Sequence, residues 1–170
     1  MSGPVISTLR ASPWLKPLTQ AELVALAGCS SRRTYQPGQL VLDPHDARIF
    51  VLRQGRLALH LTMLAEGDHC GGEADYELGT PGDALGWATW VYPDRIIASA
   101  VALEAAELVI IDMARVRDTS TFMKLSQRML QNLYGRLQEG GICPPNVRGF
   151  LKLGEASCVA VAEYEYGPRS

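Results

Sequence analysis

The stretch from Gly82 to Ala102 reads GDALGWATWVYPDRIIASAVA, and the rest of the chain is most easily understood around it. It opens with a Gly-Asp turn and a second glycine, Gly86, continues through the short apolar run 88–92, and breaks at 93–95 with Pro-Asp-Arg. The strand-like run 96–101 follows. Glycines let the backbone approach a ligand closely, and successive N–H groups at a helix start attract negative charge. This order of turn, short helix, loop and strand can wrap a small anion, although a plain connection between two strands has the same pattern.

Short strand-like runs separated by glycine turns lie on both sides of this stretch. Pro37-Gly38 and Gln54-Gly55 are such turns, and the run 56–63 alternates leucines with other residues. Strands of this length at intervals of about ten residues are typical of an antiparallel barrel or jelly roll. The expected strands are 39–42, 49–53, 56–63, 74–78, 96–101 and 108–111.

Two helical segments flank the predicted strands. Residues 12–28 form a lead-in, in which Thr19 and Glu22 have the spacing of a capping box and Gly28 is the expected C-cap. Residues 119–139 form the clearest helix, with apolar side chains on two stripes. One stripe repeats every seven residues, so we expect it to pair with a second subunit while the other stripe packs on the barrel.

From about Ser12 to Leu137 the sequence resembles the cyclic-nucleotide-binding domain family, the effector domain of Crp/Fnr-type regulators. The likeness is carried by SPWLKPLTQAELVALA, YQPGQLVLD, FVLRQGRLALHL, LGTPGDALGWATWVY and IIASAVALEAAELVIID. It implies a mainly β fold with flanking helices: an antiparallel, cupin-like jelly-roll barrel followed by a long dimer-type helix. We therefore divide the chain into an N-terminal extension (1–11), the barrel domain with its C-terminal helix (12–140) and a tail (141–170).

In this family the stretch 82–102 is the phosphate-binding cassette, in which a Glu takes the ribose hydroxyl and an Arg pairs with the cyclic phosphate. Here Trp87 stands where the Glu would follow Gly86, and Ile96 stands where the Arg would precede Ala98. A hydroxyl acceptor and a bidentate phosphate partner are both missing, so cAMP is not expected to bind in the usual way. Trp87 either stacks on another planar ligand or plugs the pocket. The candidate binding residues are Gly82, Gly86, Trp87, Ala88, Arg95, Ile96, Ala98 and Ser99.

The resemblance implies a non-enzymatic regulatory or accessory subunit that acts through protein contacts, as a homodimer through helix 119–139 and within a larger complex. One alternative is a nicotinamide-nucleotide (NADPH) binding accessory subunit of a bacterial NAD-reducing soluble hydrogenase, with Trp87 stacking on a ring. Another is a sensor that holds a modified nucleotide or other anion through the backbone amides of 82–88 and the side chains of Arg95 and Ser99. The ligand is otherwise open.

The net charge and the distribution of apolar residues limit the possible binding partners and the expected location of the protein. The net charge of −2 favours neither nucleic acid nor an anionic membrane surface, and no apolar run approaches the ~20 residues of a membrane helix. No secretion signal is evident, so we expect a cytoplasmic protein. A metal-binding cupin enzyme is a further alternative, but its metal site needs clustered histidine and carboxylate ligands. The cysteines form no CxxC pair of the kind that binds zinc. The histidines are scattered at His45, His60 and His69.

Overall fold

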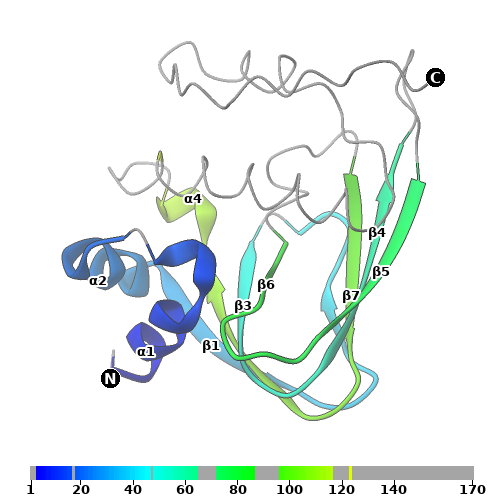
Figure 1. Cartoon of the computed structure of the whole chain (residues 1–170), viewed down its shortest axis with the longest axis horizontal. Helices are drawn as coiled ribbons and strands as arrows, with labels where there is room; N and C mark the ends of the chain where they lie inside the picture. Colours follow the sequence, from blue (N-terminus) through cyan, green and yellow to red (C-terminus); the bar gives the residue numbers. More distant parts are fainter. Residues whose placement is uncertain are drawn as a thin grey trace.

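The computed structural model describes residues 3–16, 18–46, 48–64, 72–86, 96–116 and 123. Within these residues the chain forms two four-stranded antiparallel sheets that face each other, and the N-terminal helices lie on the outer side of one of them (Figure 1). The first sheet has the order β1-β8-β3-β6 and the second the order β2-β7-β4-β5. This arrangement is the jelly-roll barrel that the strand pattern predicts.

The helices and strands have the following bounds. The helical segments are α1 (Gly3–Ala11), η1 (Pro13–Leu15), α2 (Gln20–Gly28) and α4 (Met113–Val116). The first sheet comprises β1 (Ser30–Tyr35), β3 (Ile49–Gln54), β6 (Ala84–Leu85) and β8 (Ala106–Ile111). The second comprises β2 (Leu40–Leu42), β4 (Leu57–Met63), β5 (Gly72–Leu78) and β7 (Ile96–Ala102). All six expected strands are present within a few residues.

The second sheet has one buried and one solvent-facing side, because apolar residues alternate along its strands. Every second residue of β4 is buried, beginning at Leu57, and β7 follows the same alternation, beginning at Ile96. Leu61 pairs in register with Ala98, and Met63 pairs with Ile96. The buried row of β7 is otherwise alanine, so bulky side chains on β4 lie beside small ones on β7 and fill the interior.

The centre of the first sheet is covered on both sides, whereas its edge strand β1 is mostly exposed. All six residues of β8 are buried, since one face lines the barrel and α1 packs against β1, β3 and β8 on the other. Leu9 on α1 and Leu26 on α2 are almost fully buried. Burial of a leucine stabilises a fold by about 1.5–3 kcal/mol, so these helices are part of the core. Helix α1 lies in the range expected to be an N-terminal extension and was not among the expected elements.

The predicted capping box at the start of α2 is confirmed. The Thr19 hydroxyl accepts the Glu22 N–H at 3.3 Å, and the Glu22 carboxylate accepts the Thr19 N–H at 2.7 Å. The predicted C-cap is one residue early, because Gly28 is still helical and Cys29 caps the end with its own N–H. Helix α2 therefore ends at Gly28, and β1 begins two residues later at Ser30.

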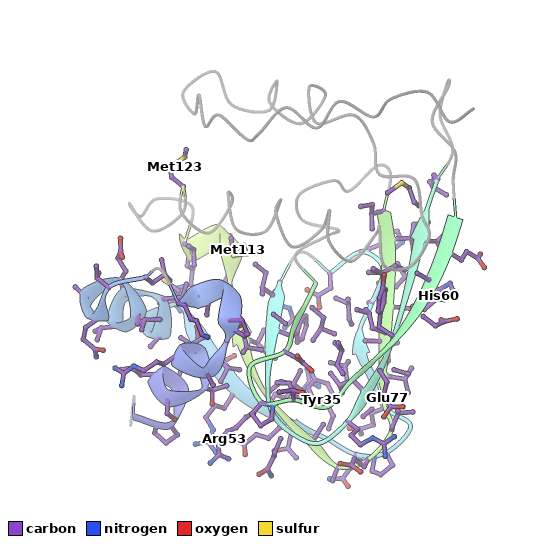
Figure 2. The ribbon with its side chains drawn as sticks, in the orientation of Figure 1. Tyr35, Arg53, His60, Glu77, Met113 and Met123 are labelled. Atoms are coloured by element: carbon purple, nitrogen blue, oxygen red, sulfur yellow. The ribbon has the colours of Figure 1, made fainter. Side chains whose placement is uncertain are left out.

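A charged cluster ties three strands of the first sheet together. Glu107 on β8 is 7% exposed and forms ion pairs with Arg32 on β1 and Arg53 on β3. Figure 2 shows Arg53 on the side of this sheet that carries the helices. The register of β3 shifts between Leu52 and Gln54, at the position of Arg53.

Several expectations fall on residues outside the described part. These are the short cassette helix at 88–92, the tail 141–170, and the helix 119–139 apart from Met123, which is helical and 38% exposed. Among the described helices, none combines the length and the apolar character that a membrane span requires.

Candidate ligand site

The first turn of the cassette is fastened to β3 before the cassette begins its predicted helix. The Gly82 N–H donates to the Leu52 carbonyl at 2.8 Å, and the Leu52 N–H donates to the Asp83 carbonyl at 2.7 Å. The Asp83 carboxylate accepts the backbone N–H groups of Gly79 (3.1 Å) and Thr80 (2.9 Å). Asp83 therefore shapes the turn itself, and its carboxylate is committed to the protein's own backbone.

Gly82 and Gly86 are required by close backbone approach. Both have positive φ, +97° and +89°, which side-chain-bearing residues rarely adopt. A Cβ on Gly82 would lie 2.5 Å from the carbonyl oxygen of Ala11. A Cβ on Gly86 would overlap the carbonyl oxygen of Arg48 and come within 3.3 Å of Phe50 Cδ2. The start of the cassette thus packs on the end of α1 at Gly82 and on the loop between β2 and β3 at Gly86.

The far end of the cassette is β7, whose two faces differ. Ile96 is 0% exposed and Ala98 is 1% exposed, and both belong to the interior row. Ser99 belongs to the opposite row and lies opposite His60 of β4, which Figure 2 shows on the outer side of the second sheet. The structure therefore brings Ile96 and Ala98 to the barrel interior and places Ser99 on the other face. Trp87, Ala88 and Arg95 lie outside the described residues.

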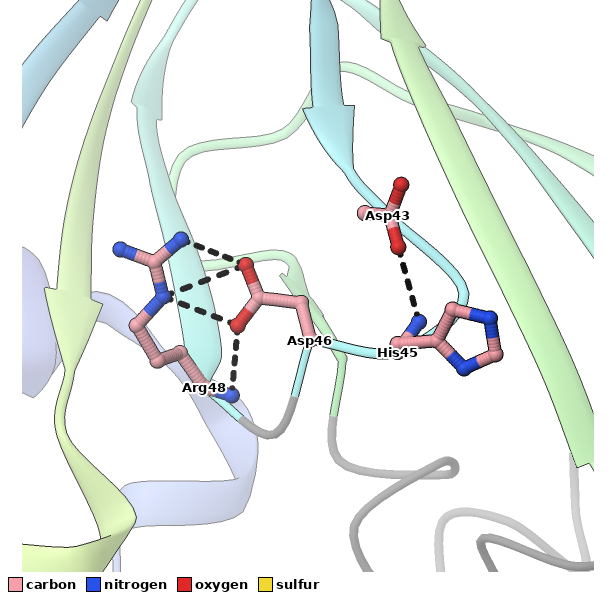
Figure 3. A network of polar contacts seen from close by, with 4 residues as sticks. All are labelled: Asp43, His45, Asp46 and Arg48. Carbon is pink, nitrogen blue, oxygen red and sulfur yellow. Dashed lines mark hydrogen bonds and ion pairs between the residues drawn. The ribbon is translucent and has the colours of Figure 1, made fainter.

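A polar loop lies against Gly86. In this loop, between β2 and β3, the Asp43 carboxylate accepts the His45 N–H at 3.0 Å (Figure 3). The Asp46 carboxylate binds the Arg48 guanidinium with both oxygens: Nε donates at 2.8 and 3.2 Å, and Nη2 donates at 2.6 Å. The Arg48 N–H adds a further bond at 3.0 Å. Arg48 is thereby held in one orientation by a residue two positions earlier.

The surroundings of Asp46 and Arg48 shift both pKa values so that the charged form of each side chain is favoured. Burial raises the pKa of the Asp46 carboxyl, but the hydrogen bonds from Arg48 and its positive charge outweigh that effect and lower it. The hydrogen bond to Asp46 raises the pKa of Arg48. Tyr35, on β1, is close enough to be affected by both charges, and desolvation is the main cause of its raised pKa. At neutral pH the loop therefore presents a carboxylate and a guanidinium together.

Phe50 links this pair to the cassette. The Arg48 guanidinium lies over the Phe50 ring at 5.5 Å from its centroid, and the same ring borders Gly86. A cation over an aromatic face is an attractive arrangement that also fixes the plane of the guanidinium. The signal that could have identified this feature is the Asp-x-Arg spacing directly before a buried strand; by itself it looks like an ordinary turn.

The described residues give no support to a metal centre. No group of three or more His, Cys, Asp or Glu side chains in this part of the chain could hold a metal ion. His60 instead bonds Asp75 through Nδ1 at 2.7 Å and Thr62 through Nε2 at 3.1 Å.

Comparisons with known proteins place the fold. No protein-family model matches the sequence, and no curated protein matches it significantly. Among solved structures, the regulatory subunit of a cAMP-independent protein kinase A from Trypanosoma brucei, a mutant bound to cAMP, has a TM-score of 0.59 at 18% identity. That match covers 90% of this chain and 52% of the other, so this chain spans about half its length.

Two further structures agree. The catabolite activator protein of Thermus thermophilus has a TM-score of 0.53 at 25% identity, covering 76% of this chain and 60% of that one. The corresponding kinase regulatory subunit from Trypanosoma cruzi, bound to guanosine, has a TM-score of 0.51 at 17% identity, covering 85% and 52%. The chain is thus an antiparallel jelly roll with an N-terminal helical lead-in. Its fold is that of the cyclic-nucleotide-binding domains, as the motifs predict.

Proposed function

We propose that this chain is a non-enzymatic regulatory or accessory subunit whose cyclic-nucleotide-binding fold does not bind cAMP in the usual way and acts through protein contacts. The observation that carries the proposal is Ile96. In the alignment that the resemblance implies, Ile96 stands where the family has its phosphate-binding Arg, and Ile96 is fully buried. A cyclic phosphate brought against a hydrocarbon side chain would lose its hydration without gaining charge-assisted hydrogen bonds.

The comparisons are compatible with this departure from cAMP. Guanosine, the ligand of the Trypanosoma cruzi structure, carries no phosphate, so the fold is able to hold a nucleoside without a charged group. A fold of this kind can therefore hold a ligand that has no phosphate. This supports a regulatory domain that has kept its architecture while its ligand chemistry has changed.

Thermal unfolding with added cAMP tests the cassette. A ligand that binds the folded chain stabilises it by RT ln(1 + [L]/Kd), about 2.7 kcal/mol at a hundredfold excess over Kd. We expect no shift in Tm for the natural sequence and a measurable shift for the double variant Trp87→Glu/Ile96→Arg, which restores both family residues. A folded double variant that gains nothing would contradict the alignment of Ile96 with the family Arg.

Exposed apolar side chains support the second half of the proposal. Leu40 and Val101 are paired in register on β2 and β7 and are 53% and 36% exposed, and Ile97 lies on the same outer face. Large apolar side chains gathered on a sheet face mark interaction surfaces in soluble proteins. Purification of a tagged chain should recover one stoichiometric partner, and Val101→Asp should lose it. Val24→Asp, at an exposed position on α2, is the matched control, and equal loss in both variants would contradict this surface.

The proposed homodimer is a separate matter, because it depends on residues 119–139. Light scattering after size exclusion should give twice the monomer mass for the natural chain, and Leu130→Asp in the expected seam should give the monomer. A monomeric natural chain would refute the dimer while leaving the regulatory proposal in place.

A second candidate is the NADPH-binding accessory subunit of a soluble hydrogenase. Its support is Trp87 in the sequence, which offers an aromatic face for a nicotinamide or adenine ring. Titration with NADPH tests it: saturable binding that Trp87→Ala abolishes would favour this candidate, and no binding would remove it.

A further inference from the structure

The outer face of the second sheet is divided into an acidic row and an apolar row. Three alternate residues of the edge strand β5 are exposed on this face, and all three are carboxylates: Glu73, Asp75 and Glu77. The apolar row lies on β7, where Ile97 and Val101 are 38% and 36% exposed. Each row follows one strand, and β4 lies between the two strands. The charged and the apolar parts of the face therefore run alongside each other.

The strand register places the carboxylates directly across the sheet from the β7 residues. Glu73 pairs with Thr62 of β4, which pairs in turn with Ile97 of β7, and the next two rows begin at Asp75 and Glu77. Directly paired residues of neighbouring strands lie on the same face of a sheet. Neighbouring strands are about 4.8 Å apart, so the acidic row and the apolar row are separated by about 10 Å.

The row between them, on β4, consists of Ala58, His60 and Thr62. All three are half-buried, and His60 bonds both Asp75 and Thr62. Figure 2 shows His60 on the outer side of this sheet. These side chains are short or held close to the sheet, so a partner element can lie along β4 and contact both rows.

The dimensions of the face indicate which element fits it. Ile97 and Val101 are four residues apart, about 14 Å along the strand, which corresponds to about nine residues of helix. An α-helix with its side chains is about 10–12 Å wide, so a helix along β4 reaches from the apolar row to the acidic row. A strand laid on a sheet face would gain no backbone hydrogen bonds, because those groups point toward neighbouring strands within the sheet.

The charge of the face selects among helices. Arg56, directly before β4, pairs with Glu77, so the row retains the negative charges of Glu73 and Asp75. Lysine or arginine side chains along one flank of a helix would be attracted to these carboxylates, whereas a glutamate flank would be repelled. An anionic membrane surface would be repelled for the same reason.

We infer that the outer face of the second sheet docks a basic amphipathic helix of a partner protein. The apolar stripe of that helix covers Ile97 and Val101, and the basic side chains on its flank reach the carboxylates of β5. The inference rests on the proposed function, in which the chain acts through protein contacts, and it names the kind of partner segment that this face accepts.

Two synthetic peptides test the inference directly. Both are about 18 residues long, enough to form a helix, and carry the same leucine stripe at positions i, i+3, i+4 and i+7. One has lysines along the flank and the other has glutamates. In fluorescence anisotropy with the full chain, the lysine peptide should bind at least about fivefold more tightly, because several exposed ion pairs each add a modest amount.

Variants of the chain assign the binding to this face. Glu73→Lys should reduce the preference for the lysine peptide by about threefold or more, since one attraction becomes a repulsion. Glu104→Lys is the matched control: it changes the net charge equally at an exposed position between β7 and β8, and it should leave the preference unchanged. Val101→Asp should weaken binding of both peptides, because both carry the leucine stripe.

Equal affinity for the two peptides, binding of neither, or the same loss in Glu73→Lys and Glu104→Lys would overturn the inference. So would binding of the chain to vesicles that contain phosphatidylserine, which would assign the face to a membrane. A change in the oligomeric mass of the chain on Val101→Asp would assign it to a second copy. The proposed function is judged separately, by whether the tagged chain recovers a stoichiometric partner. Should Val101→Asp not fold, as judged by circular dichroism, the comparison of Glu73→Lys with Glu104→Lys decides.

Discussion

Replacing Gly86 with alanine should destabilise the fold strongly, because two independent costs coincide at this residue. The first is conformational: φ is +89°, and a left-handed backbone costs an alanine about 1–2 kcal/mol. Part of that cost is offset, since alanine loses less entropy on folding than glycine does. The second is steric, because the new Cβ would overlap the Arg48 carbonyl oxygen, a backbone atom that cannot rotate away. Overpacking of this kind typically costs about 1–3 kcal/mol.

The matched control is Gly38→Ala. Gly38 has a similar φ of +81°, but a Cβ there would meet nothing within 4 Å. Urea unfolding should give a loss of about 1 kcal/mol for Gly38→Ala and about 2–4 kcal/mol for Gly86→Ala, with unchanged m-values. The difference between the two variants measures the contact between the cassette and the β2–β3 loop. Equal losses would refute the reasoning, since the backbone contact at Gly86 would then contribute nothing.

Three further predictions concern single side chains. Thr19→Ala should cost about 1 kcal/mol in urea unfolding through loss of the capping box, and a smaller loss than that of an exposed Thr→Ala change would contradict the cap. Glu107→Gln should cost about 1–3 kcal/mol because it leaves two arginines without their buried partner, whereas Glu77→Gln, in an exposed pair, should cost under about 1 kcal/mol; the reverse order would refute the buried cluster. Asp46 has a pKa below its ordinary 3.8, so its contribution is fully present above about pH 4 and is lost as the pH falls through the lower folded value. The stability gap between the natural chain and Asp46→Asn should therefore close in acid, and a gap that widens there would contradict the ion pair.

The strands of the barrel were predictable where burial imposes a regular pattern of apolar residues on the sequence. Leucines alternate along β4, and β8 is an apolar run because both of its faces are covered. Strand β1, SSRRTY, escaped prediction because it is mostly exposed and polar, and its extended conformation depends on pairing with β8. Helix α1 escaped because β-branched residues such as Val5 give it little intrinsic preference, and its burial against the first sheet supplies the stability.

The candidate site was predictable in its backbone but not in its polar groups. The positive φ of Gly82 and Gly86 agrees with the turn expected there, whereas the assignment of Ile96 to the position of the family Arg stays a prediction from the resemblance. The pairing of Asp46 with Arg48 depends on side-chain rotamers and on the approach of the loop to Gly86. Neither feature produces a residue pattern that can be recognised in the sequence. The placement of Ser99 on the outer face follows from the strand alternation once β7 is aligned with β4.

Calorimetric titration of the unaltered chain with cAMP tests the central claim most directly, because the claim is that Ile96 has removed the phosphate partner from an otherwise conventional barrel. The account predicts no saturable heat at ligand concentrations up to about 1 mM, which corresponds to less than about 4 kcal/mol of binding free energy. Saturable one-to-one binding with a micromolar or tighter Kd would contradict it.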